Sequence, residues 1–168
     1  INPQYPAAHN NLGIVFKELG QYDESIKSYK NALAIDSNYA EAHNNLGNTL
    51  KLMGKTDEAI NCYKKTIDIN PDYYEAHNNL GITLMSVGQV NKSIISYKKA
   101  LSIKKNYKDA LNNLGIAYNL LGQLDDSRKC YEEAILISPN NADVFSNLGN
   151  LMIDFKDFDA AVRSYEKA

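Results

Sequence analysis

No segment of the sequence is apolar for the roughly 18 residues that a membrane-spanning helix requires, so no span is predicted. Positive charge is not in excess either, because 18 Lys and Arg residues oppose 20 Asp and Glu residues for a formal charge of -2. Nucleic-acid-binding surfaces usually need a basic surplus, so neither nucleic acid nor a membrane is an expected partner. The first residue is Ile, and no basic segment precedes an apolar one, so no signal peptide is visible. These absences favour a cytoplasmic protein.

Glycine is scarce, and all of it falls within one repeating frame. Asn-Asn-Leu-Gly begins at Asn10, Asn44, Asn78 and Asn112, each 34 residues after the last, and Ser-Asn-Leu-Gly follows at Ser146. The 9 glycines form two columns at the same interval. A short unit repeated in this way cannot bury its apolar face alone and stacks on its neighbours. The sequence therefore predicts an array, and its function is expected on a surface.

The second repeat, 40–73, illustrates the structure expected of every unit when Ala40 is numbered position 1. Apolar and small residues follow a 3.6-residue period in its first half, which predicts a first helix, helix A. Gly54 is predicted to end this helix in a left-handed conformation. Asp57 is then predicted to cap the second helix, helix B, as are the polar residues of the same column in the other units.

Two columns of residues are predicted to hold each hairpin together. Gly47 in helix A faces small residues of helix B and is expected to let the two helices approach closely. Tyr63 in helix B belongs to a tyrosine column, and these rings are expected to pack while their hydroxyls stay in solvent.

The pattern of the second repeat resembles the tetratricopeptide repeat (TPR) family at its signature positions, which are His43, Leu46, Gly47, Leu50, Ala59, Tyr63, Thr66 and Pro71. This resemblance implies an all-α solenoid of helix-turn-helix hairpins that forms a right-handed superhelix, with A helices on the concave side. It implies one array over 1–168: a remnant of a preceding repeat at 1–5, repeats at 6–39, 40–73, 74–107 and 108–141, and a partial repeat at 142–168. Both ends are interpreted as cut, so end-to-end self-association is expected.

No catalytic or metal site is predicted in this segment. His9, His43 and His77 occupy position 4, where later repeats carry Leu111 and Phe145, so this column is interpreted as packing. Cys62 and Cys130 lie two repeats apart, too far for a disulfide. Since no phosphate-binding loop or activated nucleophile is visible, the segment is predicted to be no enzyme and to need no cofactor.

Asparagines at positions 5 and 6 form the candidate binding site. Position 6 carries Asn11, Asn45, Asn79, Asn113 and Asn147, and position 5 carries Asn10, Asn44, Asn78 and Asn112. Asn is a poor helix former, so a role other than helix stability should favour it here. A carboxamide donates and accepts, so such a ladder can bind the backbone of an extended polypeptide. Alternatively, the amides bond to one another across repeats and stiffen the array, and both roles can coexist.

Position 9 completes the predicted peptide-binding site with Ile14, Asn48, Ile82 and Ile116. Exposed apolar side chains such as these isoleucines often mark contact surfaces. The alternative is that some of them pack between adjacent A helices. The tandem asparagines look similar to the arrays of O-linked N-acetylglucosamine transferases and Spindly-like proteins. That resemblance implies a polypeptide-recruiting segment of a larger protein, such as a glycosyltransferase. The alternative hypothesis is a structural assembly module that self-associates through its ends or its convex face.

Overall fold

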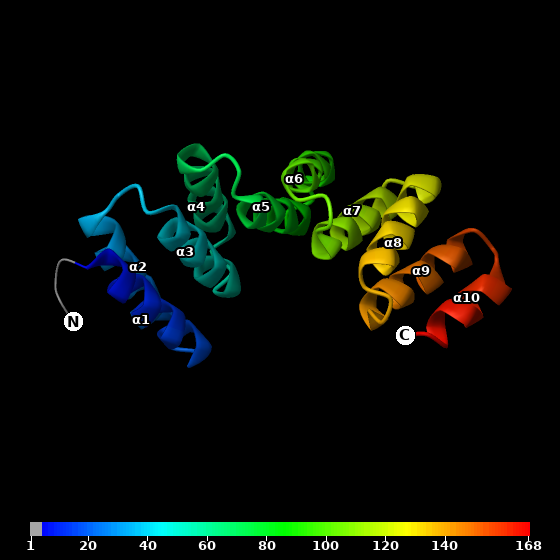
Figure 1. The fold of residues 1–168 in the computed structure, drawn as a ribbon, viewed down its shortest axis with the longest axis horizontal. Coiled ribbons are helices and arrows are strands. Elements are labelled where there is room, and N and C mark those ends of the chain that lie inside the picture. Colours follow the sequence, from blue (N-terminus) through cyan, green and yellow to red (C-terminus); the bar gives the residue numbers. More distant parts are fainter. Residues whose placement is uncertain (1–4) are drawn as a thin grey trace. The chain divides into compact units, whose positions relative to one another are not determined.

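The computed structural model describes residues 5–168, so the predicted remnant of a preceding repeat at 1–5 lies outside the described residues except for Tyr5. The described chain consists of α-helices joined by short loops, as predicted for an all-α protein (Figure 1). Each repeat contributes one helix A, and these are α1 (Pro6–Glu18), α3 (Ala40–Leu52), α5 (Tyr74–Ser86), α7 (Lys108–Leu120) and α9 (Ala142–Asp154). Each also contributes one helix B, and these are α2 (Tyr22–Ile35), α4 (Thr56–Ile69), α6 (Val90–Ile103), α8 (Leu124–Ile137) and α10 (Phe158–Tyr165).

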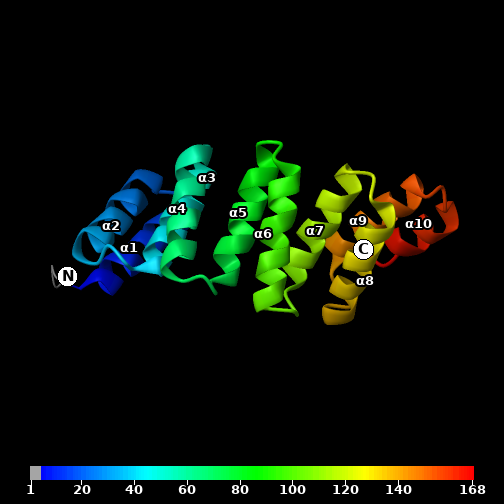
Figure 2. The ribbon, with the colours of Figure 1, turned by 90° about the horizontal axis from the view of Figure 1, so that it is seen from above.

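The helices belong to two compact units, Ile1–Thr83 and Leu84–Ala168, whose boundary lies inside α5. In the first unit α1 packs on α2, α2 on α3 and α3 on α4, and α1 also contacts α3. The second unit repeats this scheme from α6 to α10, with α7 contacting α9. Figure 2 shows the two helices of a hairpin side by side, as in α3 and α4. Each of the A helices α3, α7 and α9 therefore contacts its own B helix, the preceding B helix and a neighbouring A helix. A single array over 1–168 remains a prediction.

In the first, second, fourth and fifth hairpins, a tyrosine of helix B packs against a glycine of helix A. Tyr63 is 0% exposed, and a Cβ atom added at Gly47 would lie 2.8 Å from its ring. In the second unit, a Cβ atom at Gly115 would lie 2.6 Å from the ring of Tyr131. Only glycine leaves room for the ring at these positions. The predicted close approach of helices A and B is therefore confirmed, and the tyrosine ring is the group that requires the glycine.

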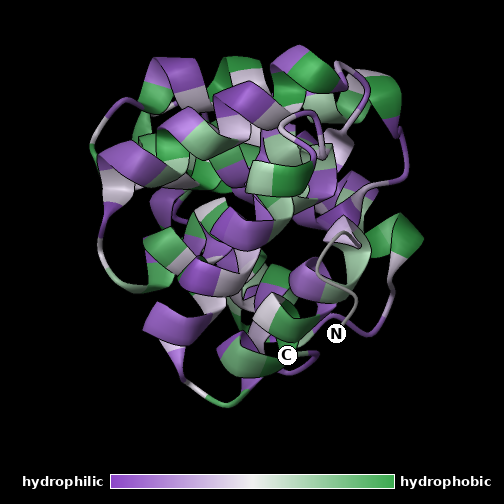
Figure 3. Cartoon of the chain, turned by 90° about the vertical axis from the view of Figure 1, so that its left-hand side faces the viewer, coloured by the Kyte–Doolittle hydropathy of each residue, from purple (hydrophilic) through white to green (hydrophobic). Residues whose placement is uncertain are grey.

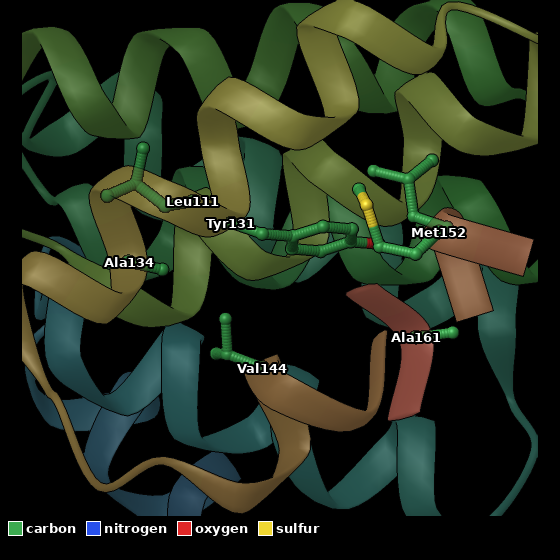
Figure 4. Close-up of a cluster of buried hydrophobic side chains, with 7 residues drawn as sticks. Leu111, Tyr131, Ala134, Val144, Met152 and Ala161 are labelled. Atoms are coloured by element: carbon green, nitrogen blue, oxygen red, sulfur yellow. The ribbon is translucent and has the colours of Figure 1, made fainter. Parts of the chain in front are cut away.

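The core of the second unit gathers around Tyr131. Its neighbours in this cluster include Leu111, Val144, Leu151 and Met152, which come from α7 and α9 (Figure 4). Hydrophobic and hydrophilic residues alternate along the helices, so each helix has a side suited to burial (Figure 3). This apolar cluster joins two successive hairpins, α7–α8 and α9–α10.

The prediction that the tyrosine hydroxyls stay in solvent is wrong for most of the helix B column. Tyr29, Tyr63 and Tyr97 are 0% exposed, and Tyr131 is 1% exposed. For Tyr29, Tyr63 and Tyr131 the cause is the glycine opposite the ring, which leaves room for the phenol between the two helices. Burial raises the pKa of Tyr131 to about 12 and raises the pKa of Tyr97 as well.

Helix A ends as predicted, whereas helix B begins differently. Gly54 has φ 73, and the equivalent glycines of the first, third and fourth repeats are also left-handed. The prediction that Asp57 caps helix B is wrong, because α4 already begins at Thr56 with Lys55 in the N-cap position and no side-chain cap. The loop after Gly54 is so short that Asp57 falls within the first turn, where its carboxylate faces the positive end of the helix.

Candidate functional site

The position-5 asparagines of the first, second and fourth repeats lie in a seam between neighbouring A helices. Asn10 is 0% exposed, Asn44 5% and Asn78 3%, while Asn112 is half-buried. Because α1 contacts α3 and α7 contacts α9, this side of each A helix faces protein. In the pattern of a single helix these residues lie opposite the main packing arc. They are nevertheless largely buried, because the seam with the neighbouring A helix covers them.

Amide-to-amide hydrogen bonds connect position 5 of one repeat to position 6 of the next. Asn45 Nδ2 donates to Asn10 Oδ1 at 3.1 Å, and Asn79 Nδ2 donates to Asn44 Oδ1 at 3.2 Å. The second unit contains the same bond, from Asn147 Nδ2 to Asn112 Oδ1 at 2.9 Å.

Asn10, the buried amide of the first repeat, also donates a hydrogen bond. Asn10 Nδ2 donates to Glu41 Oε1 at 3.2 Å, so its acceptor and one of its donors are both used. Buried polar groups require such partners. The interlocking alternative considered from the sequence is therefore present in the structure.

The asparagines at position 6 are more accessible than those at position 5. Asn11 is exposed, and Asn45, Asn79, Asn113 and Asn147 are half-buried. Asn45 and Asn79 each use one donor in the seam, and within residues 5–168 their Oδ1 atoms accept no hydrogen bond. Each of these side chains thus keeps an acceptor and a second N–H available to another molecule.

At position 9 the apolar residues differ from the asparagine. Ile14, Ile82 and Ile116 are half-buried. Asn48 instead accepts a hydrogen bond from the Tyr63 hydroxyl at 2.9 Å, which turns its amide towards helix B. Asn150 and Tyr165 repeat this pairing at 2.6 Å. In the sequence, the signal for this pairing is an Asn at position 9, where other repeats carry Ile.

One helical turn beyond position 9, two leucines extend the apolar surface. Leu52 on α3 is 57% exposed, and Leu120 on α7 is 64% exposed. Positions 9 and 13 are four residues apart and therefore share one side of the helix. Within each unit, the position-6 asparagines, the position-9 isoleucines and the exposed leucine at position 13 are named the A-face of that unit.

The titratable column at position 4 supports the loops. His43 Nε2 hydrogen bonds the Ser37 carbonyl at 3.0 Å, and His77 Nε2 hydrogen bonds the Pro71 carbonyl at 2.9 Å. Among the described residues no three His, Cys, Asp or Glu side chains gather as metal ligands would. Cys62 and Cys130 are both free thiols, and burial raises their pKa values to about 11 and about 12.

Over the part of the chain that the structure describes, none of the helices has the length and apolar character needed to cross a bilayer. The side chains that make up the A-face offer amide and apolar groups.

Family models with the descriptions TPR repeat and Tetratricopeptide repeat match this chain. The TPR repeat model matches residues 15–54 and 83–122, and the tetratricopeptide models match 40–73, 62–94 and 109–141. These stretches together run without a gap from 15 to 141. The chain belongs to the tetratricopeptide repeat family. As a TPR array, it is a protein–protein interaction module.

Solved TPR structures share this fold. A crystal structure of MamA is 27% identical with a TM-score of 0.83, and the match covers 93% of this chain and 91% of that chain. YrrB, described as a TPR protein with an unusual peptide-binding site, is 20% identical with a TM-score of 0.78, covering 99% and 86%. PilF of Pseudomonas aeruginosa is 18% identical with a TM-score of 0.89, covering 96% and 74%. No curated protein sequence matches the chain.

Proposed function

We propose that the A-face binds an extended polypeptide. The observation that carries this proposal is that the asparagines at position 5 are largely buried in the structure, whereas those at position 6 are more accessible. Position 5 is buried and hydrogen bonded, so it fixes the neighbouring amides of position 6, while Asn45 and Asn79 keep outward hydrogen-bonding capacity. An extended backbone offers a donor and an acceptor at each residue, which is what a carboxamide can pair with.

The apolar part of the A-face supplies affinity. Leu52 and Leu120 expose side chains that gain by leaving water when a partner covers them. The amides pair with main-chain groups, so they place few demands on the side chains of the partner. The proposed specificity is therefore broad, with a preference for segments that carry apolar side chains. In YrrB the same fold is associated with a peptide-binding site, which agrees with this use of the family architecture.

The test compares variants that change the A-face without changing the seam. Asn11 is exposed and forms no hydrogen bond within the described chain, so Asn11→Ala, Leu52→Ser and Leu120→Ser should leave the fold intact. We expect the triple variant to lose most binding on an array of immobilised peptides. Ile95→Ser is the control, because Ile95 is 67% exposed on α6, a B helix. Equal peptide binding by the triple variant and the wild type would reject the A-face as the site.

A second function, self-association, is favoured by one specific observation. Val162 on α10 is 56% exposed, whereas the residues at its position in the first three repeats, Ile26, Ile60 and Ile94, are 8–9% exposed. This face of α10 therefore presents a surface that other repeats bury against a following helix A. The glycosyltransferase parent inferred from the tandem asparagines stays a prediction, as does a cytoplasmic location.

A further inference from the structure

A second surface, independent of the A-face, is a cavity of about 280 Å³ in the second unit. Its wall combines residues of α8, α9 and α10 with Lys167, which follows α10. The floor is apolar and comes from Phe145, Leu148 and Met152 of α9. These three residues are spaced i, i+3 and i+7, so they share one side of the helix, and Asn147 lies on the other side. The cavity and the A-face are thus on different sides of α9.

An arginine in a normally apolar column lines this cavity. The equivalent residues Ile26, Ile60 and Ile94 are buried, whereas the side chain of Arg128 is 45% exposed. Its guanidinium lies over the Phe155 ring, with Cζ 5.3 Å from the ring centroid, and an exposed ion pair joins it to Asp125 at 3.1 Å. Arg128 therefore places a charged side chain at the rim of the cavity, where the first three repeats carry a buried isoleucine.

The other charged groups of the rim lack strong partners. Arg163 forms no ion pair within residues 5–168, and neither does Glu132, the acidic side chain of the lining. The ammonium of Lys167 lies 5.8 Å from the centroid of Phe145, above the floor of the cavity. The lining holds three cations and one carboxylate, and Asp125, which is not part of the lining, pairs with Arg128. The rim therefore keeps a net positive charge, which comes from Arg163 and Lys167.

We propose that this cavity binds an acidic peptide segment, with a carboxylate held by Arg163 and its neighbouring cations and an apolar side chain on the floor. Arginine pairs with a carboxylate in a planar, two-bonded arrangement, which makes it suited to hold an acidic side chain at this rim. The apolar floor distinguishes a peptide side chain from a phosphate backbone, which has no group to place there. The proposal does not depend on the A-face.

The test uses a fluorescein-labelled pentapeptide Glu-Glu-Leu-Glu-Glu and its neutral counterpart Gln-Gln-Leu-Gln-Gln, with binding followed by fluorescence anisotropy. We expect the acidic peptide to bind more tightly than the neutral one, and added salt to reduce the difference. Arg128→Ile restores the residue type of the column, so the fold should be retained while affinity falls about fivefold. Arg163→Gln should cause a loss of similar size.

Lys129→Gln is the matched control, because Lys129 is an exposed cation of α8 outside the cavity lining. Unchanged affinity in Arg128→Ile and Arg163→Gln would overturn the proposal. So would a loss as large in Lys129→Gln, or a single-stranded oligonucleotide that competes better than the acidic peptide. Loss of binding in the A-face triple variant alone would assign the peptide to the A-face and overturn only this inference.

Discussion

At the scale of single residues, the tyrosine hydroxyls reveal how position 9 and helix B depend on each other. Tyr63 is buried and donates to Asn48, whereas the hydroxyls of Tyr29 and Tyr97 are buried without a hydrogen-bond partner among the described residues. The repeats of these two tyrosines carry Ile at position 9. An Ile at this position makes the A-face apolar. It cannot accept a hydrogen bond, so the buried tyrosine hydroxyl is desolvated without a compensating hydrogen bond, which is unfavourable.

This difference predicts opposite effects for the same substitution. Tyr97→Phe removes a hydroxyl without a partner, so the free energy of unfolding should stay unchanged or rise by about 1 kcal/mol. Tyr63→Phe removes the donor to Asn48 and should lower it by about 1 kcal/mol. Urea denaturation followed by circular dichroism measures both. Equal destabilisation by the two substitutions would contradict the assignment of the hydrogen bonds.

At the scale of the helix, the sequence predicted the hairpins but not the seam. The 34-residue spacing and the two glycine columns were enough to predict helices A and B and the left-handed end at Gly54, because these features depend on local chemistry. Bonding of the amides across repeats is open from the sequence only as an alternative, and the burial of Asn10 and Asn44 does not follow from it, since periodicity describes one helix and does not say which flank meets a neighbouring A helix. Asp57 was misplaced for a related reason, because a shift of two residues in loop length separates an N-cap from a first turn.

The ends of the A helices provide a matched pair of substitutions. Four repeats use glycine in the left-handed position, whereas the last uses Lys156 at φ 60. Lys156→Gly should therefore raise the free energy of unfolding by about 1 kcal/mol. Gly122→Ala should lower it by a similar amount, because nothing lies within 4 Å of the added Cβ atom and only the backbone conformation is penalised. Thermal melting of both variants tests this, and a stabilising Gly122→Ala would contradict it.

At the scale of the whole molecule, the exposed faces of α1 and α10 correspond to the two sides of a seam that lies inside a unit. Ser25 of helix B and Thr49 at position 10 of the next helix A meet at 3.3 Å inside the first unit. At position 10, Thr49, Ala117 and Leu151 are fully buried. Val15, which occupies the same position on α1, is 53% exposed. Val162 is exposed at the opposite end. A contact between unlike faces of two copies is head-to-tail and can continue along a chain of molecules.

Head-to-tail association makes a prediction that a symmetric dimer does not. The wild-type protein should increase in mass with concentration in light scattering, while Val15→Glu and Val162→Glu should each stay monomeric because a buried unpaired charge blocks the contact. Mixed together, these variants should form a 1:1 dimer that grows no further, since Val15→Glu retains the α10 face and Val162→Glu retains the α1 face. Dimerisation of Val15→Glu alone would indicate that two α10 faces meet symmetrically. A wild type that stays monomeric at the highest concentration would show that the exposed valines make no interface in solution.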